Sequence, residues 1–452
     1  MNKFLEFREK YPDFIYDSYK IDEIDNDYLI TFNFEVPNLT QYNPTLRFSK
    51  DIIKNKNVDE GYFNYLVFHI GLIELISYVK CTCSPNIIIK AGYLDDDQIN
   101  FFKKLYYYGL GEFLYINNID IEMDKLFNIK IDCKKTKLNN INYKGNGNLI
   151  PIGGGKDSNV SLEILRSDYD SNTCIVMNPK QVHLECIKAG GYDENNTIKY
   201  YRTLDKNMLE LNKKGFLNGH TPFSSLVAFT TYFLAYLSNK KYIVLSNEGS
   251  ANESTVLGTK INHQYSKTYE FENDFNNYTK KYFNIDIKYF SLLRALNEFQ
   301  IGMLFSHYDK YHKVFKSCNV GSKGKEWKWC CNCAKCLFVY IILSPFLYKE
   351  KLIDIFGEDL YENKDLLNTF IELLGYGKTK PFECVGTYNE VRYAISLTID
   401  KLGNNLPYLL KYYKDNYKLE LDLNIEKEYN KENNIDPQFE KLLKEELDKY
   451  VK

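Results

Sequence analysis

The chain lacks an excess of charge of either sign. It contains 58 lysines and arginines against 60 aspartates and glutamates, a formal net charge of −2 over 452 residues. Proteins that hold nucleic acid through its phosphates usually carry a basic surplus or a basic stripe, and the sequence shows neither. The composition therefore argues against a nucleic-acid partner.

Long apolar segments suited to a membrane are also missing. The longest charge-free runs include 221–239, which carries Ser224, Ser225, Thr230 and Thr231, and 336–348. The second run is too short, because a membrane-spanning helix needs about 20 residues. Both runs predict buried helices. The first residues, MNKFLEFREKYPDF, have six charged side chains and no apolar core, so no secretory signal is predicted and we expect a cytoplasmic protein.

Eleven cysteines without a predicted secretory signal favour reduced thiols or a metal site over disulfides. Cys330, Cys333 and Cys336 form a C-x2-C-x2-C pattern, with Cys331 inserted and Cys318 upstream. Four thiolates suffice for tetrahedral zinc, so Cys318, Cys330, Cys333 and Cys336 are candidate zinc ligands. The alternative is a set of buried thiols that pack as small apolar side chains.

The arrangement of predicted helices and strands divides the chain. Apolar residues make up 44%, which excludes wholesale disorder, and the length favours about three domains. Helical spacing over 59–80, and a start at Asp95 with three acids, predict helices before residue 148. Strands alternate with helices from Leu149, which predicts a parallel sheet with helices on both faces. We therefore expect an α/β protein with an α+β domain at 1–147, an α/β nucleotide-binding domain at 148–345, and a mostly helical region at 346–452.

The sharpest motif is a glycine loop between a predicted strand and a predicted helix, with the sequence Gly153-Gly154-Gly155-Lys156-Asp157-Ser158. Glycines allow unusual backbone conformations and the close approach of a ligand, and a helix N-terminus favours phosphate. Lys156 adds a positive charge, and Ser158 adds a hydroxyl donor. Asp157 suits a phosphate site only if a divalent cation lies between them. The alternative is a glycine-rich turn without a ligand.

Two common nucleotide motifs do not fit this loop. A Walker loop needs glycine where Ile150 stands, and serine or threonine where Asp157 stands. The dinucleotide fingerprint needs glycine at Ser158. The segment instead resembles the pyrophosphate loop Ser-Gly-Gly-x-Asp-Ser of ATP pyrophosphatases, with Gly153 in place of the leading serine. That resemblance implies a fold like that of the adenine-nucleotide α-hydrolases, and cleavage of ATP to AMP and pyrophosphate.

A second polar segment, 246–254, directly follows the buried strand predicted at 242–245. Such loops carry the ligands of parallel sheets, because ligands bind beyond the carboxyl ends of the strands. The expected nucleotide contacts outside the glycine loop are Asn247, Ser250 and Met177, and the expected magnesium ligands are Asp157, Glu248 and Glu253. The alternative is a solvated turn.

Several stretches together resemble one family, the ATP-dependent UDP-N-acetylmuramoyl-L-alanyl-L-glutamate epimerases of bacterial wall synthesis. The matching stretches are 71–78, 109–115, 153–158, 218–222, 246–253, 262–267, 329–336 and 380–387. The resemblance implies that ATP adenylates the terminal carboxylate of the UDP-muramoyl dipeptide, after which the Cα proton is removed and returned on the other face. Water then releases AMP and the D-Glu product. Adenylation removes the carboxylate charge, so negative charge need not develop beside negative charge.

The base that removes the proton is less well defined. Cys384 is our first candidate, since it lies in a segment flanked by proline and glycine, but a thiol serves at neutral pH only if a nearby cation lowers its pKa. Glu390, His220 and His263 compete with it. Packing alone would also explain Cys384, and a role in a capping loop would explain His220.

Two other function classes remain open. Another adenylating enzyme with a pyrophosphate loop, such as a ligase, a tRNA-thiolating enzyme or a deazapurine nitrile synthase, would share the ATP site; the balanced charge argues against the tRNA version. A non-catalytic nucleotide-sensing module stabilised by zinc is the third possibility. The sequence leaves the oligomeric state and the position of the UDP group open.

Overall fold

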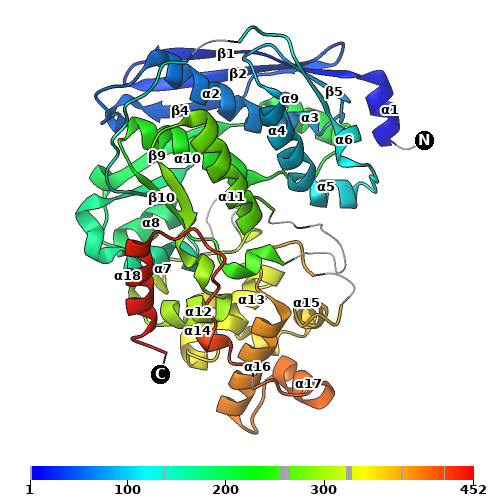
Figure 1. The fold of residues 1–452 in the computed structure, drawn as a ribbon. Helices are drawn as coiled ribbons and strands as arrows, with labels where there is room; N and C mark the ends of the chain where they lie inside the picture. Colours follow the sequence, from blue (N-terminus) through cyan, green and yellow to red (C-terminus); the bar gives the residue numbers. More distant parts are fainter. Residues whose placement is uncertain are drawn as a thin grey trace.

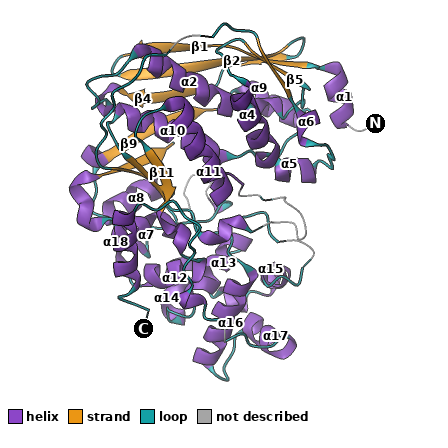
Figure 2. Ribbon diagram, viewed as in Figure 1, coloured by secondary structure: helices purple, strands orange, loops and turns teal. Residues whose placement is uncertain are grey.

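The computed structural model describes residues 3–135, 138–253, 262, 265–321, 328–377, 380–421 and 423–451, and all structural statements refer to these residues. An eleven-stranded sheet runs through the protein in the order β11-β10-β7-β8-β9-β4-β2-β1-β5-β6, with β3 paired to β2 (Figure 2). The strands are β1 (Asp13–Ile24), β2 (Asp27–Val36), β3 (Thr40–Tyr42), β4 (Thr45–Ser49), β5 (Asn86–Ile89), β6 (Asn128–Ile131), β7 (Asn148–Pro151), β8 (Asn172–Met177), β9 (Thr197–Thr203), β10 (Tyr242–Leu245) and β11 (Lys288–Ser291).

Five neighbouring strands, β11-β10-β7-β8-β9, are all parallel. The chain leaves β7 toward β8 and β9 on one side, and later returns to the other side through β10 and β11. The strand order therefore reverses between β7 and β10. Parallel sheets bind ligands in the crevice beyond the carboxyl ends of the strands at such a reversal. The α/β class predicted from the sequence is confirmed.

Side chains of the parallel strands alternate between two separate cores. Leu149 and Ile243 belong to one core, whereas their neighbours Ile150 and Val244 belong to the other. Successive side chains of a strand point to opposite faces, so both faces of this half of the sheet are covered, as predicted. Helices α2 and α10 pack together over the first core, and α7, α12 and α13 pack in the second.

The N-terminal strands continue the same sheet. Strand β4 pairs antiparallel with β9, with Leu46 opposite Arg202, and β2 and β1 follow antiparallel. Strands β5 and β6 then add in parallel at the far edge. The division at residue 147 stays a prediction, because strands from both sides of it form this one sheet.

Helices lie on one side of the N-terminal strands β1 and β2 and fill the C-terminal region (Figure 1). They are α1 (Lys3–Lys10), α2 (Glu60–Glu74), α3 (Ile76–Val79), α4 (Asp96–Gly109), α5 (Gly111–Ile116), α6 (Met123–Leu126), α7 (Lys156–Ile164), α8 (Gln181–Ala189), α9 (Lys206–Lys213), α10 (Phe223–Leu237), α11 (Tyr269–Tyr278), α12 (Glu298–Ser306), α13 (Ala334–Leu343), α14 (Lys349–Phe356), α15 (Leu367–Leu373), α16 (Tyr388–Leu402), α17 (Tyr408–Asn416) and α18 (Pro437–Leu447). Helix α18 returns to pack beside α7.

The apolar helices lie inside the protein. The two charge-free runs considered above form α10 and α13, and most of their side chains are buried. Segment Glu60–Val79 is long and apolar enough to cross a membrane by length and composition alone. Within its most apolar window, 89% is buried by the rest of the chain, as in a core helix.

Candidate functional site

The glycine loop lies at the carboxyl end of β7, where the strand order reverses. Strand β7 ends at Pro151, and α7 begins at Lys156 with Gly155 as its N-cap. Gly154 has φ +75°, in the left-handed region that favours glycine. A Cβ atom on Gly155 would lie 2.8 Å from Ser317 Oγ, whereas one on Gly153 would meet no atom of the described residues within 4 Å. The loop therefore needs glycine for its shape, and the described residues leave space beside Gly153.

Lys156 occupies a fully buried position at the start of α7. Its ammonium group forms ion pairs with the carboxylates of Asp157 and Glu298, and Glu298 is itself the first residue of α12. Burial favours the neutral amine, but the two carboxylates outweigh it and raise the pKa of Lys156. Burial also raises the pKa of Glu298 to about 8, against the opposing effect of Lys156. Lys156 therefore keeps its charge in the interior.

Asp157 is held as a carboxylate by several lysines. Burial would raise its pKa, but Lys156, Lys335 and Lys267 together lower it. Glu248, buried in the loop after β10, acts electrostatically on both Glu298 and Lys267. These six side chains form what we call the charge cluster: Lys156, Asp157, Glu248, Lys267, Glu298 and Lys335.

The polar segment after β10 lies on the other side of the strand reversal. The guanidinium of Arg294, fully buried, donates to the Glu248 carbonyl oxygen at 2.9 Å and also to the carbonyl of Lys267. Asn247 Nδ2 donates to Ser291 Oγ at 3.1 Å. The buried Ser250 Oγ has no partner among the described residues, and it lines a cavity of about 540 Å³. Arg294 thus fixes two segments of the site, and Ser250 keeps its hydroxyl available.

The predicted magnesium ligands do not all face the same group. Asp157 and Glu248 belong to the charge cluster, but Glu253 forms an ion pair with the buried Lys380. Two predicted nucleotide contacts lie at the same edge of the sheet: Met177 ends β8, and Ser158 Oγ donates to the Gly155 carbonyl at 3.3 Å. The structure thus brings the glycine loop, Met177 and the β10 loop to one edge.

Cys384 has the cationic neighbour that its proposed role requires. Lys267 Nζ lies 3.2 Å from Cys384 Sγ. Burial lowers the pKa of Lys267, but the negative charge of the Cys384 thiolate and of nearby carboxylates raises it overall. The Lys335 ammonium donates to the Cys384 carbonyl, and the Lys335 backbone N–H donates to Glu383 Oε2 at 2.9 Å. A lysine beside a cysteine favours the reactive thiolate. The segment that carries Cys384 is thus held by two lysines of the charge cluster.

The competing bases occupy other positions. Glu390 is buried, burial raises its pKa, and its two carboxylate oxygens accept backbone N–H bonds from Glu298 and Thr387. It closes a capping box at the start of α16, which is a structural task. His220 Nδ1 lies 3.9 Å from Glu112 Oε2, on the loop before α10. His263 lies outside the described residues, as does Ser254 of the polar segment.

The four candidate zinc ligands come together. Their sulfur atoms all lie within 4.8 Å of one another. By contrast, the inserted Cys331 turns away, with its Sγ 3.2 Å from the Phe356 carbonyl oxygen. The four cysteines adjoin the charge cluster in the sequence, because Lys335 of the charge cluster stands between Cys333 and Cys336.

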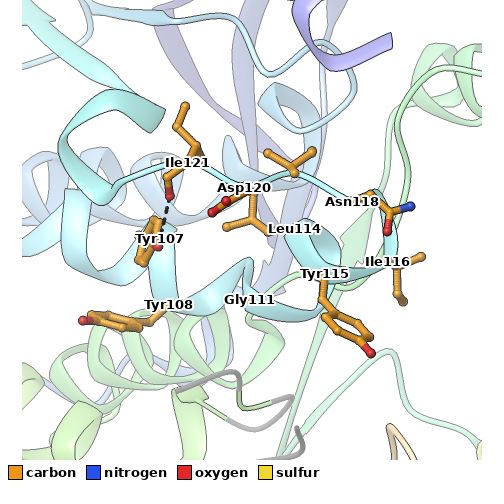
Figure 3. A pocket seen from close by; sticks show the side chains of 10 residues that line it. Tyr107, Tyr108, Gly111, Leu114, Tyr115, Ile116, Asn118, Asp120 and Ile121 are labelled. Atoms are coloured by element: carbon orange, nitrogen blue, oxygen red, sulfur yellow. Dashed lines mark hydrogen bonds between the residues drawn. The ribbon is translucent and has the colours of Figure 1, made fainter. Parts of the chain in front are cut away.

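A pocket that the sequence did not indicate opens between α4, α5 and the following loop (Figure 3). Its volume is about 700 Å³, and its lining includes Tyr107, Tyr108, Leu114, Tyr115 and Asp120. The ring of Tyr115 lies 5.7 Å from that of Phe382, and the ring of Tyr108 lies 5.4 Å from that of Tyr265. Phe382 and Tyr265 are each two residues from the Cys384–Lys267 pair. The pocket therefore adjoins the segments that carry this pair.

Glu298, Lys335 and Arg294 were missed by sequence reasoning. Glu298 did have a local signal, since Asn297 and Gln300 form a capping box directly after β11 and its short helical turn. That pattern repeats the arrangement of strand, loop and helix that marked the glycine loop. Lys335 and Arg294 had no comparable signal, because only the folded chain brings them to the site.

Comparison with known proteins identifies the family of this chain. A family model described as the MurL N-terminal domain matches residues 6–292, and one described as the MurL C-terminal domain matches residues 314–418. A protein of Xanthomonas oryzae pv. oryzae, named UDP-N-acetyl-alpha-D-muramoyl-L-alanyl-L-glutamate epimerase, is 33% identical over 332 residues, 72% of either chain. A protein of Salinispora tropica with the same name is 32% identical over 339 residues, 74% of this chain and 72% of its own. The chain therefore belongs to the MurL family.

Proposed function

We propose that this chain is an ATP-dependent epimerase that inverts the terminal L-Glu of UDP-N-acetylmuramoyl-L-alanyl-L-glutamate to D-Glu during peptidoglycan precursor synthesis. AMP and diphosphate are the other products. The names of its relatives supply the reaction. The observation that carries the ATP requirement is the position of the glycine loop, with its buried lysine, at the strand reversal between β7 and β10.

In this proposal the nucleotide binds at the edge of the sheet where β7 ends and α7 begins. The strand order and the loop support a pyrophosphate-loop fold of the adenine-nucleotide α-hydrolase type. The N-terminus of α7 presents backbone N–H groups and a positive dipole end toward the space above Gly153. Lys156 adds a charge that burial does not remove. These groups suit the triphosphate of ATP.

The carboxylates of the charge cluster fit a magnesium ion. Magnesium prefers oxygen ligands and is usually held by one or two carboxylates plus phosphate oxygens. Asp157 is anionic, Glu248 is buried nearby, and Glu298 Oε1 is buried without a hydrogen-bond partner among the described residues. Bound magnesium would neutralise phosphate charge as the carboxylate displaces diphosphate. Glu298, through this Oε1, thus joins Asp157 and Glu248 as a proposed magnesium ligand.

Proton transfer is the task of the Cys384 segment. Once the substrate carboxylate is an adenylate ester, removal of the Cα proton produces an enolate instead of a second adjacent anion. Cys384, as a thiolate beside Lys267, takes this proton. The ammonium groups of Lys267 and Lys335 stabilise the developing oxyanion. The pocket beside Phe382 and Tyr265 leaves room for the larger part of the substrate.

One assay tests the proposal. Protein, magnesium, ATP and the UDP-muramoyl dipeptide should yield AMP and the D-Glu form of the dipeptide in equal amounts, the D-Glu being assayed after acid hydrolysis, and Lys156→Ala should abolish both. Exposed Lys188 on α8 provides a matched control, because Lys188→Ala should leave both products unchanged. AMP formed only with a different acceptor would identify another adenylating enzyme. No AMP with any acceptor would favour a non-catalytic nucleotide-binding module.

A further inference from the structure

The four clustered cysteines have the geometry of a single tetrahedral metal site. Zinc–thiolate bonds of about 2.3 Å in a tetrahedron place the sulfur atoms about 3.8 Å apart. The measured Sγ–Sγ distances are 3.5 Å for Cys333–Cys336, 3.8 Å for Cys330–Cys336 and 4.0 Å for Cys318–Cys333. In an iron–sulfur cluster the four thiolates are divided among two or more iron atoms, so that not all four lie this close to one another. These four cysteines form no disulfide, so a disulfide does not explain the cluster.

Local backbone structure also suits thiolate ligands at this position. The Gly321 N–H donates to Cys318 Sγ at 3.1 Å, as expected of a neighbour that orients a metal ligand. Cys333 is the N-cap of α13, where the helix dipole favours an anion. Cys331 adopts φ +55°, a left-handed conformation uncommon for residues other than glycine. This turn directs Cys331 away and leaves Cys330 and Cys333 on the same side.

We propose that Cys318, Cys330, Cys333 and Cys336 bind one zinc ion, and that this ion fastens the glycine loop and the Cys384 segment to each other. The metal site itself does not depend on the proposed function. The link between the two segments rests on that function, because it would join the proposed nucleotide site to the segment that carries the proposed base.

The link to the glycine loop runs through the residues just before Cys318. The Lys316 backbone N–H donates to the Gly154 carbonyl at 2.9 Å. Ser317 lies so close to Gly155 that a Cβ there would come within 2.8 Å of Ser317 Oγ. The next residue is the first zinc ligand. A metal that fixes Cys318 therefore also fixes the strip of chain that packs against the nucleotide loop.

The link to the Cys384 segment runs through Lys335. This residue stands between the ligands Cys333 and Cys336 at the start of α13. Its backbone N–H and its ammonium hold Glu383 and the Cys384 carbonyl, respectively. The metal would fix one ligand on each side of Lys335. Loss of the metal would therefore free Lys335, which positions Cys384.

Metal content tests the first half of the proposal. We expect protein purified under reducing conditions to contain about one zinc per chain by elemental analysis. Cys330→Ser should lose most of this zinc on dialysis against a chelator, whereas the adjacent Cys331→Ser should retain it. Should Cys330→Ser fail to fold, cobalt substitution of the wild-type protein gives the same answer through the visible absorption of tetrahedral thiolate-bound Co²⁺. Wild-type protein that binds neither zinc nor cobalt would overturn the proposal.

Hydrogen exchange tests the second half without substrate or turnover. Removal of zinc from the full-length protein should speed amide exchange in 153–157, 316–321 and 383–386, and leave the β1–β2 hairpin unchanged. A zinc-binding protein whose glycine loop and Cys384 segment exchange equally fast with and without metal would refute the fastening role. A protein that shows the predicted exchange but forms no AMP would instead contradict only the proposed function.

Discussion

Lys267 is expected to set the pH at which Cys384 becomes a base, and the substitution Lys267→Met removes that charge while keeping most of the side-chain length. The Nζ–Sγ distance of 3.2 Å gives an attraction between ammonium and thiolate of about 1.3 kcal/mol at the dielectric constant of water and about 5 kcal/mol at an effective value of 20. One pKa unit corresponds to about 1.4 kcal/mol. The pH at which the rate of proton exchange rises should therefore increase by about 1 to 4 units, toward the lower end because Lys267 is only half-buried.

The assay is the exchange of the substrate Cα hydrogen with deuterated solvent, measured from about pH 6 to 10 in the presence of ATP. AMP formation, followed in the same samples, shows whether adenylation still occurs. Cys384→Ala should reduce Cα exchange by a factor of about 10² to 10⁴, typical of a lost general base, while AMP still forms. Lys188→Met serves as the control. An unshifted pH profile in Lys267→Met, or undiminished exchange in Cys384→Ala, would refute the assignment of the base.

Two further predictions concern buried charges. Arg294→Met should lower the free energy of unfolding by about 3–5 kcal/mol in chemical denaturation, because it leaves the buried Glu272 without its ion pair. Adding Glu272→Gln should recover part of this loss. An Arg294→Met variant as stable as the wild-type protein would contradict the account. Burial raises the pKa of Glu298 from about 4.5 to about 8, so the folded protein keeps a proton that the unfolded chain releases. The stability due to this group is fully present below pH 4.5 and is lost as the pH rises to about 8. Glu298→Gln should remove this fall in the free energy of unfolding with rising pH. Parallel curves of unfolding free energy against pH for the two proteins would show that Glu298 does not cause it.

The sequence predicted the parts of the site that depend on neighbouring residues. The glycine loop, the segment after β10 and the C-x2-C-x2-C pattern are all short motifs, and each lies where a strand or helix pattern placed it. Asp95 begins α4 as a capping residue, as its acidic start predicted. The predicted helix over 59–80 appears as α2 and α3, with a break at Leu75.

Other features depend on contacts between distant segments. Glu298 meets Lys156 across 142 positions of the chain, and Lys335 meets Cys384 across 49. The pairing of β4 with β9 that joins the two halves of the sheet likewise has no local signal. A single sequence carries no information on such pairs, because periodicity reports only which face of an element is buried. The cation beside Cys384 was therefore a requirement of the proposed chemistry that only the folded chain could supply.

The most direct test of the central claim is a crystal structure with a non-hydrolysable ATP analogue and magnesium. We predict that the triphosphate lies beyond the ends of β7 and β10, with backbone N–H groups of residues 153–156 directed at its phosphate oxygens and with Lys156 and Asp157 beside it. A nucleotide bound elsewhere on the protein, with the glycine loop closed by its own chain, would contradict the account.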